Sequence, residues 1–142
     1  MAATVLIVDD ETLLLRTLSN ALRDVGYEVL SASSAEGGEA LLESRTGSVD
    51  LMLLDVKLPG RSGLDLLEQQ RRQGYVGSAI VMTAFDSPDS EGRCRQLSVD
   101  RYLRKPFDLE AMLGLIHDLL EGRGIQSGST LNGTNGLTPE GG

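Results

Sequence analysis

Three short apolar runs along the chain, each closed by a polar residue, predict strands that are buried on both faces. The clearest run spans residues 49–55, where four consecutive apolar residues lead into Asp55. A short, continuous apolar run is typical of a central strand in a parallel sheet. Two segments of more mixed polarity predict the remaining strands, and we expect the first of them nearer a sheet edge. The predicted strands are residues 4–8, 27–32, 49–55, 79–83 and 101–104.

Apolar residues at helical spacing separate these strands and predict five helices. The first helix carries its apolar residues on one stripe and is expected to end at Gly26, as the residue after the helix cap. The fourth helix is interrupted by Gly92 and offers a buried face only at Cys94 and Leu97, so it should be short and marginal. The stripe of the first helix consists of Leu14, Leu18, Ala21, Leu22 and Val25.

Small polar residues mark where the other helices begin, because their side chains can accept hydrogen bonds from the free amides of the first turn. The second helix should reach about Arg45, the third should end near Gly74, and the last should run to about Glu121. The capping signals are Ser33 with Glu36, Ser62 with Asp65, Ser87 with Pro88, and Asp108.

Five strands that alternate with five helices predict an α/β fold with one doubly wound, five-stranded parallel sheet covered on both faces. The length of 142 residues suits a single domain. Near the C-terminus Gly, Ser, Asn and Thr dominate. We therefore expect one domain over residues 1–121 and a flexible tail or linker over residues 122–142.

Charge and composition narrow the function classes. A formal net charge of −8 argues against direct nucleic-acid binding by this segment, since the phosphate backbone requires clustered Lys and Arg. The single cysteine, Cys94, excludes an intramolecular disulfide and fits a reducing compartment. The N-terminus lacks the features of a signal peptide, and no apolar run reaches the ~20 residues of a membrane helix. The expected location is the cytoplasm, with no membrane partner.

Polar residues stand at the ends of four predicted strands: Asp9 with Asp10, Asp55, Thr83 and Lys105. Because the carboxyl ends of parallel strands lie along one edge of a sheet, these side chains should share one crevice. Three carboxylates so close together repel each other unless a positive partner compensates them. Mg²⁺ fits this need, since it binds carboxylates, waters and phosphate oxygens. Lys105 and the Thr83 hydroxyl together suit a phosphoryl group.

In this order and at these strand ends, the motifs resemble the response-regulator receiver domain of two-component signal transduction. The resemblance extends from about residue 4 to about residue 121. It implies a flavodoxin-like, receiver-type three-layer sandwich that serves as a phosphorylation-dependent switch in signalling and phosphorelay. Its only catalysis would be its own phosphorylation and dephosphorylation. The motifs are Val8-Asp9-Asp10, Asp55 followed by Pro59 and Gly63, Thr83-Ala84, and Tyr102-Leu103-Arg104-Lys105-Pro106-Phe107.

The resemblance implies a role for each matching carboxylate. Asp55 would be the phosphoacceptor, whose carboxylate attacks phosphorus in line. Asp9 and Asp10 would form the Mg²⁺ site together with Asp55 and the backbone carbonyl of Lys57.

Three residues beyond the carboxylates also receive roles from the resemblance. Lys105 would hold a phosphoryl oxygen, Thr83 would close on the phosphorylated form, and Tyr102 would be the switch aromatic that turns inward with Thr83. The bond between Lys105 and Pro106 matches one that is cis in the family.

The resemblance also implies the partners of the switch. The phosphoryl donor would be a histidine kinase or a histidine phosphotransfer protein. The signal would leave through the surface of the fourth helix, fifth strand and fifth helix, toward an output protein or effector domain that the sequence does not identify. A phosphorylation-dependent homodimer is left open.

Two positions depart from the commonest family pattern. Lys57, two residues after Asp55, can point into the site, and the bulky Phe85 lies two residues after Thr83. We hypothesise that Phe85 restricts the hydrolytic water and lengthens the phosphorylated state. The dephosphorylation rate of Phe85→Ala tests this hypothesis, and an unchanged lifetime contradicts it.

Three alternative functions fit parts of the pattern. A haloacid-dehalogenase-like phosphatase needs an aspartate where Lys57 stands, and a flavin-binding protein needs a phosphate-cradling loop where residues 9–11 are acidic. The stronger alternative is a receiver-like protein-interaction module that works without phosphorylation. All the residues expected for phosphorylation are present, and phosphate uptake by Asp55 distinguishes the two readings.

Overall fold

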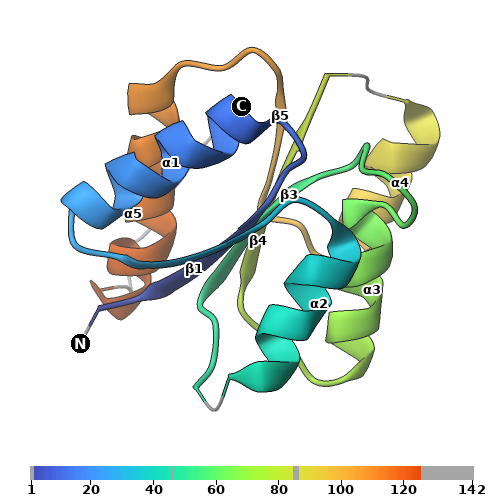
Figure 1. The fold of residues 1–142 in the computed structure, drawn as a ribbon, viewed down its shortest axis with the longest axis horizontal. Helices are drawn as coiled ribbons and strands as arrows, with labels where there is room; N and C mark the ends of the chain where they lie inside the picture. The colour runs from blue at the N-terminus through green and yellow to red at the C-terminus, as the bar shows by residue number, and fades with distance from the viewer. Residues whose placement is uncertain (1, 46, 85–86, 126–142) are drawn as a thin grey trace. The chain divides into compact units, whose positions relative to one another are not determined.

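The computed structural model describes residues 2–45, 47–84 and 87–125, in which strands and helices alternate (Figure 1). The chain forms two compact units: residues 1–107, which contain the whole sheet, and residues 108–142, which contain the last helix. The elements are β1 (Thr4–Val8), α1 (Thr12–Asp24), β2 (Glu28–Ala32), α2 (Ala35–Ser44), β3 (Leu51–Asp55), α3 (Gly63–Arg72), β4 (Ser78–Thr83), α4 (Pro88–Gln96), β5 (Arg101–Arg104) and α5 (Leu109–Ile125).

All five strands are parallel and lie in the order β2-β1-β3-β4-β5. The predicted fold class is confirmed, and β2 lies at an edge of the sheet as expected. Val8 is in register with Leu54, and Asp55 is in register with Met82. This register brings the residues that follow β1, β3 and β4 to one edge of the sheet, where open α/β sheets bind ligands.

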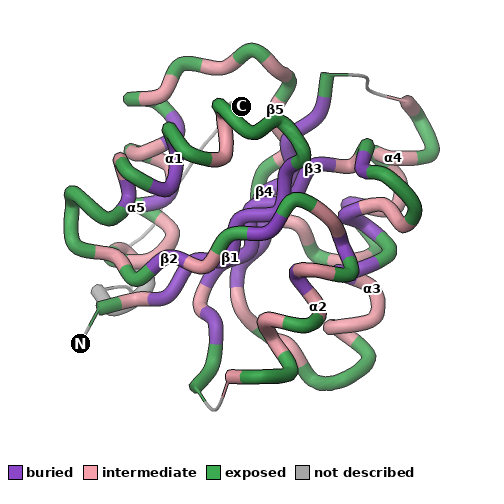
Figure 2. The backbone as a smooth tube through the Cα atoms, viewed as in Figure 1, coloured by how far each residue is buried: buried purple, intermediate pink, exposed green. Residues whose placement is uncertain are grey.

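Aliphatic side chains of the central strands form the core. Every residue of β1, β3 and β4 is buried (Figure 2). Leu6, Val8, Met52 and Leu54 pack in one cluster with residues of α2 and α3, while α1 lies on the opposite face of the sheet (Figure 1). Because successive strand residues point to opposite faces, a strand covered on both sides must be apolar throughout, which explains the continuous apolar runs in the sequence.

The predicted caps of α3 and α4 are confirmed. Ser62 Oγ accepts a hydrogen bond from the Asp65 amide at 3.0 Å, and an Asp65 carboxylate oxygen accepts one from the Ser62 amide at 3.1 Å. These reciprocal bonds form a capping box. Ser87 caps α4 through the amide of Ser90, with Pro88 at the first helical position.

The cap of α2 differs from the prediction by one residue. Ser34, and not Ser33, adopts the extended conformation of a helix cap, and its Oγ accepts a hydrogen bond from the Gly37 amide at 3.0 Å. Helix α2 begins at the fully buried Ala35, so Ser34 and not Ser33 stands at the position from which a side chain can reach the free amide of Gly37. The predicted pairing of Ser33 with Glu36 is therefore wrong.

The end of α1 confirms one prediction and corrects another. Gly26 has a φ of +104°, the left-handed conformation expected of the residue after a helix cap. Leu18 and Leu22 are fully buried, but Val25 is 60% exposed and does not belong to the buried stripe. Helix α1 ends at Asp24, so Val25 leaves the helical path and no longer follows its periodicity.

The last two helices differ in how far the sequence anticipated them. Helix α4 is short, with nine residues, as predicted, and Cys94 is its one buried residue, whereas Leu97, the other residue expected on the buried face, follows the helix as its C-cap and is only partly buried. Burial raises the pKa of the Cys94 thiol to about 11.

Asp108 caps α5 as expected, accepting a hydrogen bond from the Ala111 amide at 3.0 Å. Helix α5 continues to Ile125, past the predicted end near Glu121. Within the described residues, none of the helices has the length and apolar character needed to span a bilayer.

Candidate functional site

Asp9, Asp55 and Lys105 meet at the carboxyl edge of the sheet, as the sequence predicted. Lys105 Nζ donates hydrogen bonds to Asp9 Oδ2 at 2.7 Å and to Asp55 Oδ2 at 3.0 Å. Asp9 is fully buried and Asp55 is 4% exposed. Buried carboxylates need a partner of opposite charge or several hydrogen bonds, and one ammonium group is shared between these two.

Backbone hydrogen bonds fix the orientation of both carboxylates. The Glu11 amide donates to Asp9 Oδ1 at 2.8 Å, and the Lys57 amide donates to Asp55 Oδ1 at 3.1 Å. Each carboxylate therefore has one oxygen bound to the backbone two residues further along the chain and the other bound to Lys105. Such local bonds hold a side chain in place without distant contacts.

Lys105 is positioned by the strand that precedes it. Its amide donates to the carbonyl oxygen of Thr83 at 2.8 Å, which continues the pairing of β5 with β4. The peptide bond between Lys105 and Pro106 is cis, as expected.

Gly63 allows the backbone to pass close to Asp55. A Cβ atom at position 63 would collide with the carbonyl oxygen of Asp55 and lie 3.1 Å from Leu54 Cβ. The Gly63 amide also donates to the carbonyl oxygen of Val56 at 3.3 Å. A residue without a side chain is therefore required where the loop after β3 returns into α3.

The charges of the site influence each other. Burial raises the pKa of Asp55 above its ordinary value, and the negative charge of Asp9 adds to this increase, while the Lys105 hydrogen bond opposes it. Burial by itself lowers the pKa of Lys105, but its hydrogen bonds to Asp9, Glu11 and Asp55 outweigh burial and raise the pKa. Lys105 is therefore held in its charged form, and the carboxylates around it carry excess negative charge.

Asp9, Asp10 and Asp55 each offer a carboxylate oxygen, and these oxygens lie within 4.8 Å of one another. Ligand oxygens of an octahedral magnesium ion with bond lengths of about 2.1 Å are about 3.0 Å apart when adjacent and about 4.2 Å apart when opposite, so these oxygens would have to move closer together to share one ion. Asp10 is exposed, while the other two are buried. The donor set consists of oxygens alone, and the site carries excess negative charge. Both features fit Mg²⁺.

The remaining predicted site residues range from buried to exposed. Thr83 ends β4 and is 1% exposed, and Tyr102 in β5 is partly buried and in register with Val81. The Lys57 side chain is exposed. Phe85, for which we hypothesised an effect on the hydrolytic water, lies outside the described residues.

Sequence reasoning missed the role of Glu11. Its Oε1 lies 2.6 Å from Lys105 Nζ, so that Lys105 contacts three carboxylates. Glu11 also lines an open groove of about 550 Å³, together with Leu13, Leu14 and Phe107. The signal in the sequence was a third consecutive acidic residue after the first strand, but its contact with Lys105 depends on the tertiary fold.

Comparison with known proteins agrees with this geometry. The family model for the response regulator receiver domain matches residues 5–117. The chain is 35% identical over 127 residues to the transcriptional regulatory protein CiaR of Streptococcus pneumoniae, covering 89% of this chain and 55% of that protein. It is 36% identical over 107 residues to the alkaline phosphatase synthesis transcriptional regulatory protein PhoP of Bacillus subtilis, covering 75% and 44%. The chain thus spans about half the length of these curated relatives.

Solved structures share the fold. A CheY-like response regulator receiver domain protein from Methanospirillum hungatei matches with a TM-score of 0.81 and 30% identity, covering 87% of this chain and 98% of that one. A response regulator receiver domain protein from Clostridium thermocellum matches with a TM-score of 0.76 and 27% identity, covering 87% and 98%.

Proposed function

This chain belongs to the response regulator receiver domain family, and on that premise we propose that Asp55 accepts the phosphoryl group of a phosphorylation-dependent signalling switch. Receiver domains are signalling proteins, and the catalysis proposed for this one is limited to its own phosphorylation and dephosphorylation. The observation that carries the proposal is the buried Asp55 carboxylate, which shares the Lys105 ammonium with Asp9 at the carboxyl edge of the sheet.

The proposed donor is a histidine kinase or a histidine phosphotransfer protein. An Asp55 carboxylate oxygen forms the new bond to phosphorus while the bond between phosphorus and the donor imidazole nitrogen breaks, and its electron pair stays on that nitrogen. Such a transfer passes through a loose transition state, so positioning and charge neutralisation do most of the catalysis. The backbone bond from Lys57 to Asp55 Oδ1 supports the positioning, since it holds the carboxylate in one orientation.

We propose that Asp9, Asp10, Asp55 and the backbone carbonyl of Lys57 hold Mg²⁺. The ion would supply positive charge that neutralises phosphoryl oxygens and reduces the repulsion between two anionic reactants. The spacing of the three carboxylates supports this assignment. Lys105 donates to a phosphoryl oxygen from the other side and keeps its positive charge, because three carboxylates raise its pKa.

The proposed readout begins at Thr83 and Tyr102. Thr83 is the last residue of β4, and β4 is paired with both β3, which ends in Asp55, and β5, which carries Tyr102. Closure of the Thr83 hydroxyl on the phosphoryl group would let Tyr102 turn inward and change the surfaces of α4, β5 and α5. A change of about two negative charges at Asp55 is large enough to bias such a two-state surface.

The proposed recipient of the signal is an output protein or effector domain. Both curated relatives are named as transcriptional regulatory proteins, and the chain matches about half of each. This supports an output in gene regulation, carried by a partner or segment other than the residues described.

The test is phosphorylation by a small phosphodonor with Mg²⁺, read by intact mass. We expect one phosphoryl group on the wild-type chain, none on Asp55→Asn, and a normal adduct on Asp24→Asn, an exposed carboxylate at the far end of α1. No adduct on the wild type, or an adduct that persists in Asp55→Asn, contradicts the proposal. The first outcome favours the alternative, a receiver-like interaction module that works without phosphorylation.

A further inference from the structure

Glu11 contacts Lys105 although it belongs neither to the three carboxylates of the candidate metal site nor to the capping hydrogen bonds of helix α1. It is not one of the three carboxylates that could share a metal ion, which are Asp9, Asp10 and Asp55. It occupies the cap position of α1, with φ −81° and ψ 101°, but its side chain accepts no hydrogen bond from the first turn of that helix. Its carboxylate instead reaches Lys105 Nζ at 2.6 Å.

The three carboxylates on Lys105 differ in exposure. The side chains of Asp9 and Asp55 are 0% and 6% exposed, whereas that of Glu11 is 60% exposed. Releasing a buried carboxylate from its partner is costly, whereas an ion pair with a solvent-exposed carboxylate contributes little to stability. Glu11 is therefore the partner that Lys105 can give up most readily.

An ammonium group has three N–H donors, and in this structure three carboxylates accept from Lys105. A phosphoryl oxygen can bind Lys105 only by displacing one of them. From this geometry we propose that Glu11 is a positioning residue that holds Lys105 at the rim of the site and competes with the incoming phosphoryl group for it. The inference rests on the proposed function of Asp55 and names a regulator of that site.

The proposal predicts opposite effects on phosphorylation and on metal binding. Glu11→Gln replaces the ion pair with at most a neutral hydrogen bond and so weakens the hold on Lys105, and phosphorylation by a small phosphodonor at saturating Mg²⁺ should become about two- to fivefold faster, as expected for loss of an exposed ion pair. The same change removes a negative charge near the metal cluster, so Mg²⁺ affinity measured by calorimetry should fall by a similar factor.

Glu11→Asp tests the contact with Lys105 separately from the negative charge near the metal cluster. Its carboxylate is shorter by one methylene and should lose Lys105 while keeping the negative charge. We expect faster phosphorylation, as in Glu11→Gln, but Mg²⁺ affinity close to that of the wild type. Asp24→Asn, with the same charge change as Glu11→Gln at the opposite end of α1, is the matched control and should alter neither quantity.

The chain offers a direct readout of the contact, since it has only two lysines, Lys57 and Lys105. Selective ¹³C/¹⁵N labelling of lysine gives two side-chain signals by NMR, and Lys57 is the internal reference. In the metal-free protein, Glu11→Gln and Glu11→Asp should both shift the Lys105 side-chain signal and speed the exchange of its ammonium protons with water, while Asp24→Asn leaves it unchanged.

The outcomes separate this inference from the proposed function. Wild-type phosphorylation with equal rates in all variants, or a Glu11→Asp variant that matches the wild type in both rate and Lys105 signal, overturns the role of Glu11 alone. A wild-type chain that takes up no phosphoryl group overturns the function of Asp55 and the competition with it, whatever the lysine signals show.

Discussion

Lys105 favours the ionised form of Asp55, whereas burial and the nearby charge of Asp9 disfavour it. It is 4% exposed, lies near the charge of Asp9, and has a pKa above the ordinary value, which means that the fold disfavours its ionised form. Lys105 compensates Asp9, Glu11 and Asp55 with one positive charge. The metal-free site therefore carries charge repulsion that a bound cation would relieve.

Asp55→Asn should stabilise the metal-free protein. The amide keeps a carbonyl oxygen for the Lys57 N–H but carries no charge, so it avoids both the burial of an ionised group and the repulsion from Asp9 that raise the pKa of Asp55, and we expect the free energy of unfolding to rise. Urea denaturation in a chelator measures this. Added Mg²⁺ should stabilise the wild type more than the variant. The stability advantage that Asp55→Asn has over the metal-free wild type should therefore shrink. A variant less stable than the metal-free wild type contradicts the prediction.

Gly63→Ala should destabilise the fold by about 1–3 kcal/mol, because the new methyl group would meet the backbone of Asp55. Gly92→Ala is the matched control. Among the described residues, and apart from the helix's own backbone and chain neighbours, a Cβ atom there would meet nothing nearer than Arg95 Nη2 at 3.9 Å, and alanine should stabilise helix α4 by up to ~1 kcal/mol. Urea denaturation compares both variants, and a Gly63→Ala protein as stable as the wild type contradicts the close approach.

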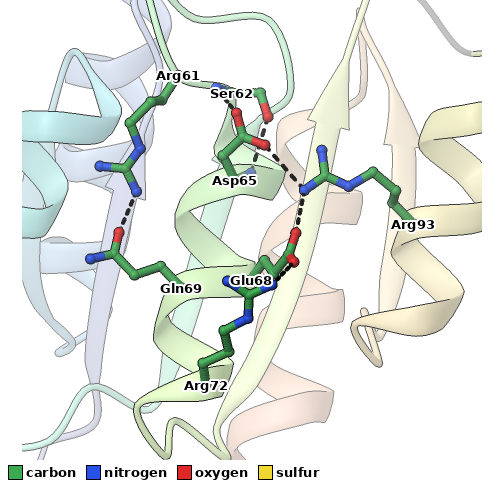
Figure 3. Close-up of polar contacts among 7 residues, drawn as sticks. All are labelled: Arg61, Ser62, Asp65, Glu68, Gln69, Arg72 and Arg93. Carbon is green, nitrogen blue, oxygen red and sulfur yellow. Dashed lines mark hydrogen bonds and ion pairs between the residues drawn. The ribbon is translucent and has the colours of Figure 1, made fainter.

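Ion pairs connect helix α4 to α3 (Figure 3), beside an apolar cluster in which Cys94 of α4 packs with Leu64 of α3 and Val81 of β4. An Arg93 guanidinium nitrogen lies 3.1 Å from Asp65 Oδ1 and 2.8 Å from Glu68 Oε1, and Glu68 also pairs with Arg72 at 2.6 Å. Cys94 is the one buried residue of α4. Little apolar surface is thus available to hold α4, which matters because α4 belongs to the surface proposed to change on phosphorylation.

Arg93→Ala should loosen α4. The pairs are partly exposed, so each contributes at most about 1 kcal/mol, and amide hydrogen exchange in α4 should become about two- to fivefold faster. Arg95→Ala, an exposed arginine on the same helix, should leave exchange in α4 almost unchanged. Equal exchange in the wild type and Arg93→Ala would show that the pairs do not hold the helix.

The start of α3 should depend on pH through Asp65. The hydrogen bond from the Ser62 amide lowers the pKa of Asp65 below its ordinary value of 3.8, and the pair with Arg93 adds to this. The folded state therefore favours the ionised form. The stabilisation of the fold by ionised Asp65 is complete at pH values above the ordinary pKa. It is lost as the pH falls through the lower pKa that Asp65 has in the folded state. The difference in unfolding free energy between wild type and Asp65→Asn should be largest at neutral pH and shrink below about pH 4. A constant difference contradicts the assignment.

The site depends on the order of the strands in the whole sheet. Asp9 and Lys105 are far apart in the sequence, and the order β1-β3-β4-β5 brings their strand ends to one edge. The residues of the site described above lie in the first compact unit, residues 1–107. The proposed boundary between domain and tail concerns the second unit, where α5 continues to Ile125.

Removal of residues 126–142 should leave the thermal midpoint and the phosphorylation of Asp55 unchanged. Leu131 and Leu137 are the only large apolar residues of that segment, which is too few to bury much surface. Differential scanning calorimetry and intact mass on a chain ending at Ile125 test the proposal. A lower midpoint would show that the segment packs on the domain, contrary to the predicted tail.

Local patterns predicted the elements because each depends on neighbouring residues. The apolar runs identified β1, β3 and β4, and the spacing of Ser62 and Asp65 identified the capping box of α3. The errors lie at element ends. The predicted Ser33 cap and the predicted burial of Val25 depend on where α2 begins and where α1 ends, and tertiary packing decides those points.

The sequence by itself determined the fold class and which residues stand at the strand ends, since periodicity and capping act over a few residues. The tertiary structure decided which of those residues meet. It joined Lys105 to Asp9 and Asp55, required glycine at position 63, and added Glu11 as a third partner of Lys105. These contacts cross up to 96 positions of the chain, and only the register of a folded parallel sheet brings such distant side chains within hydrogen-bond distance.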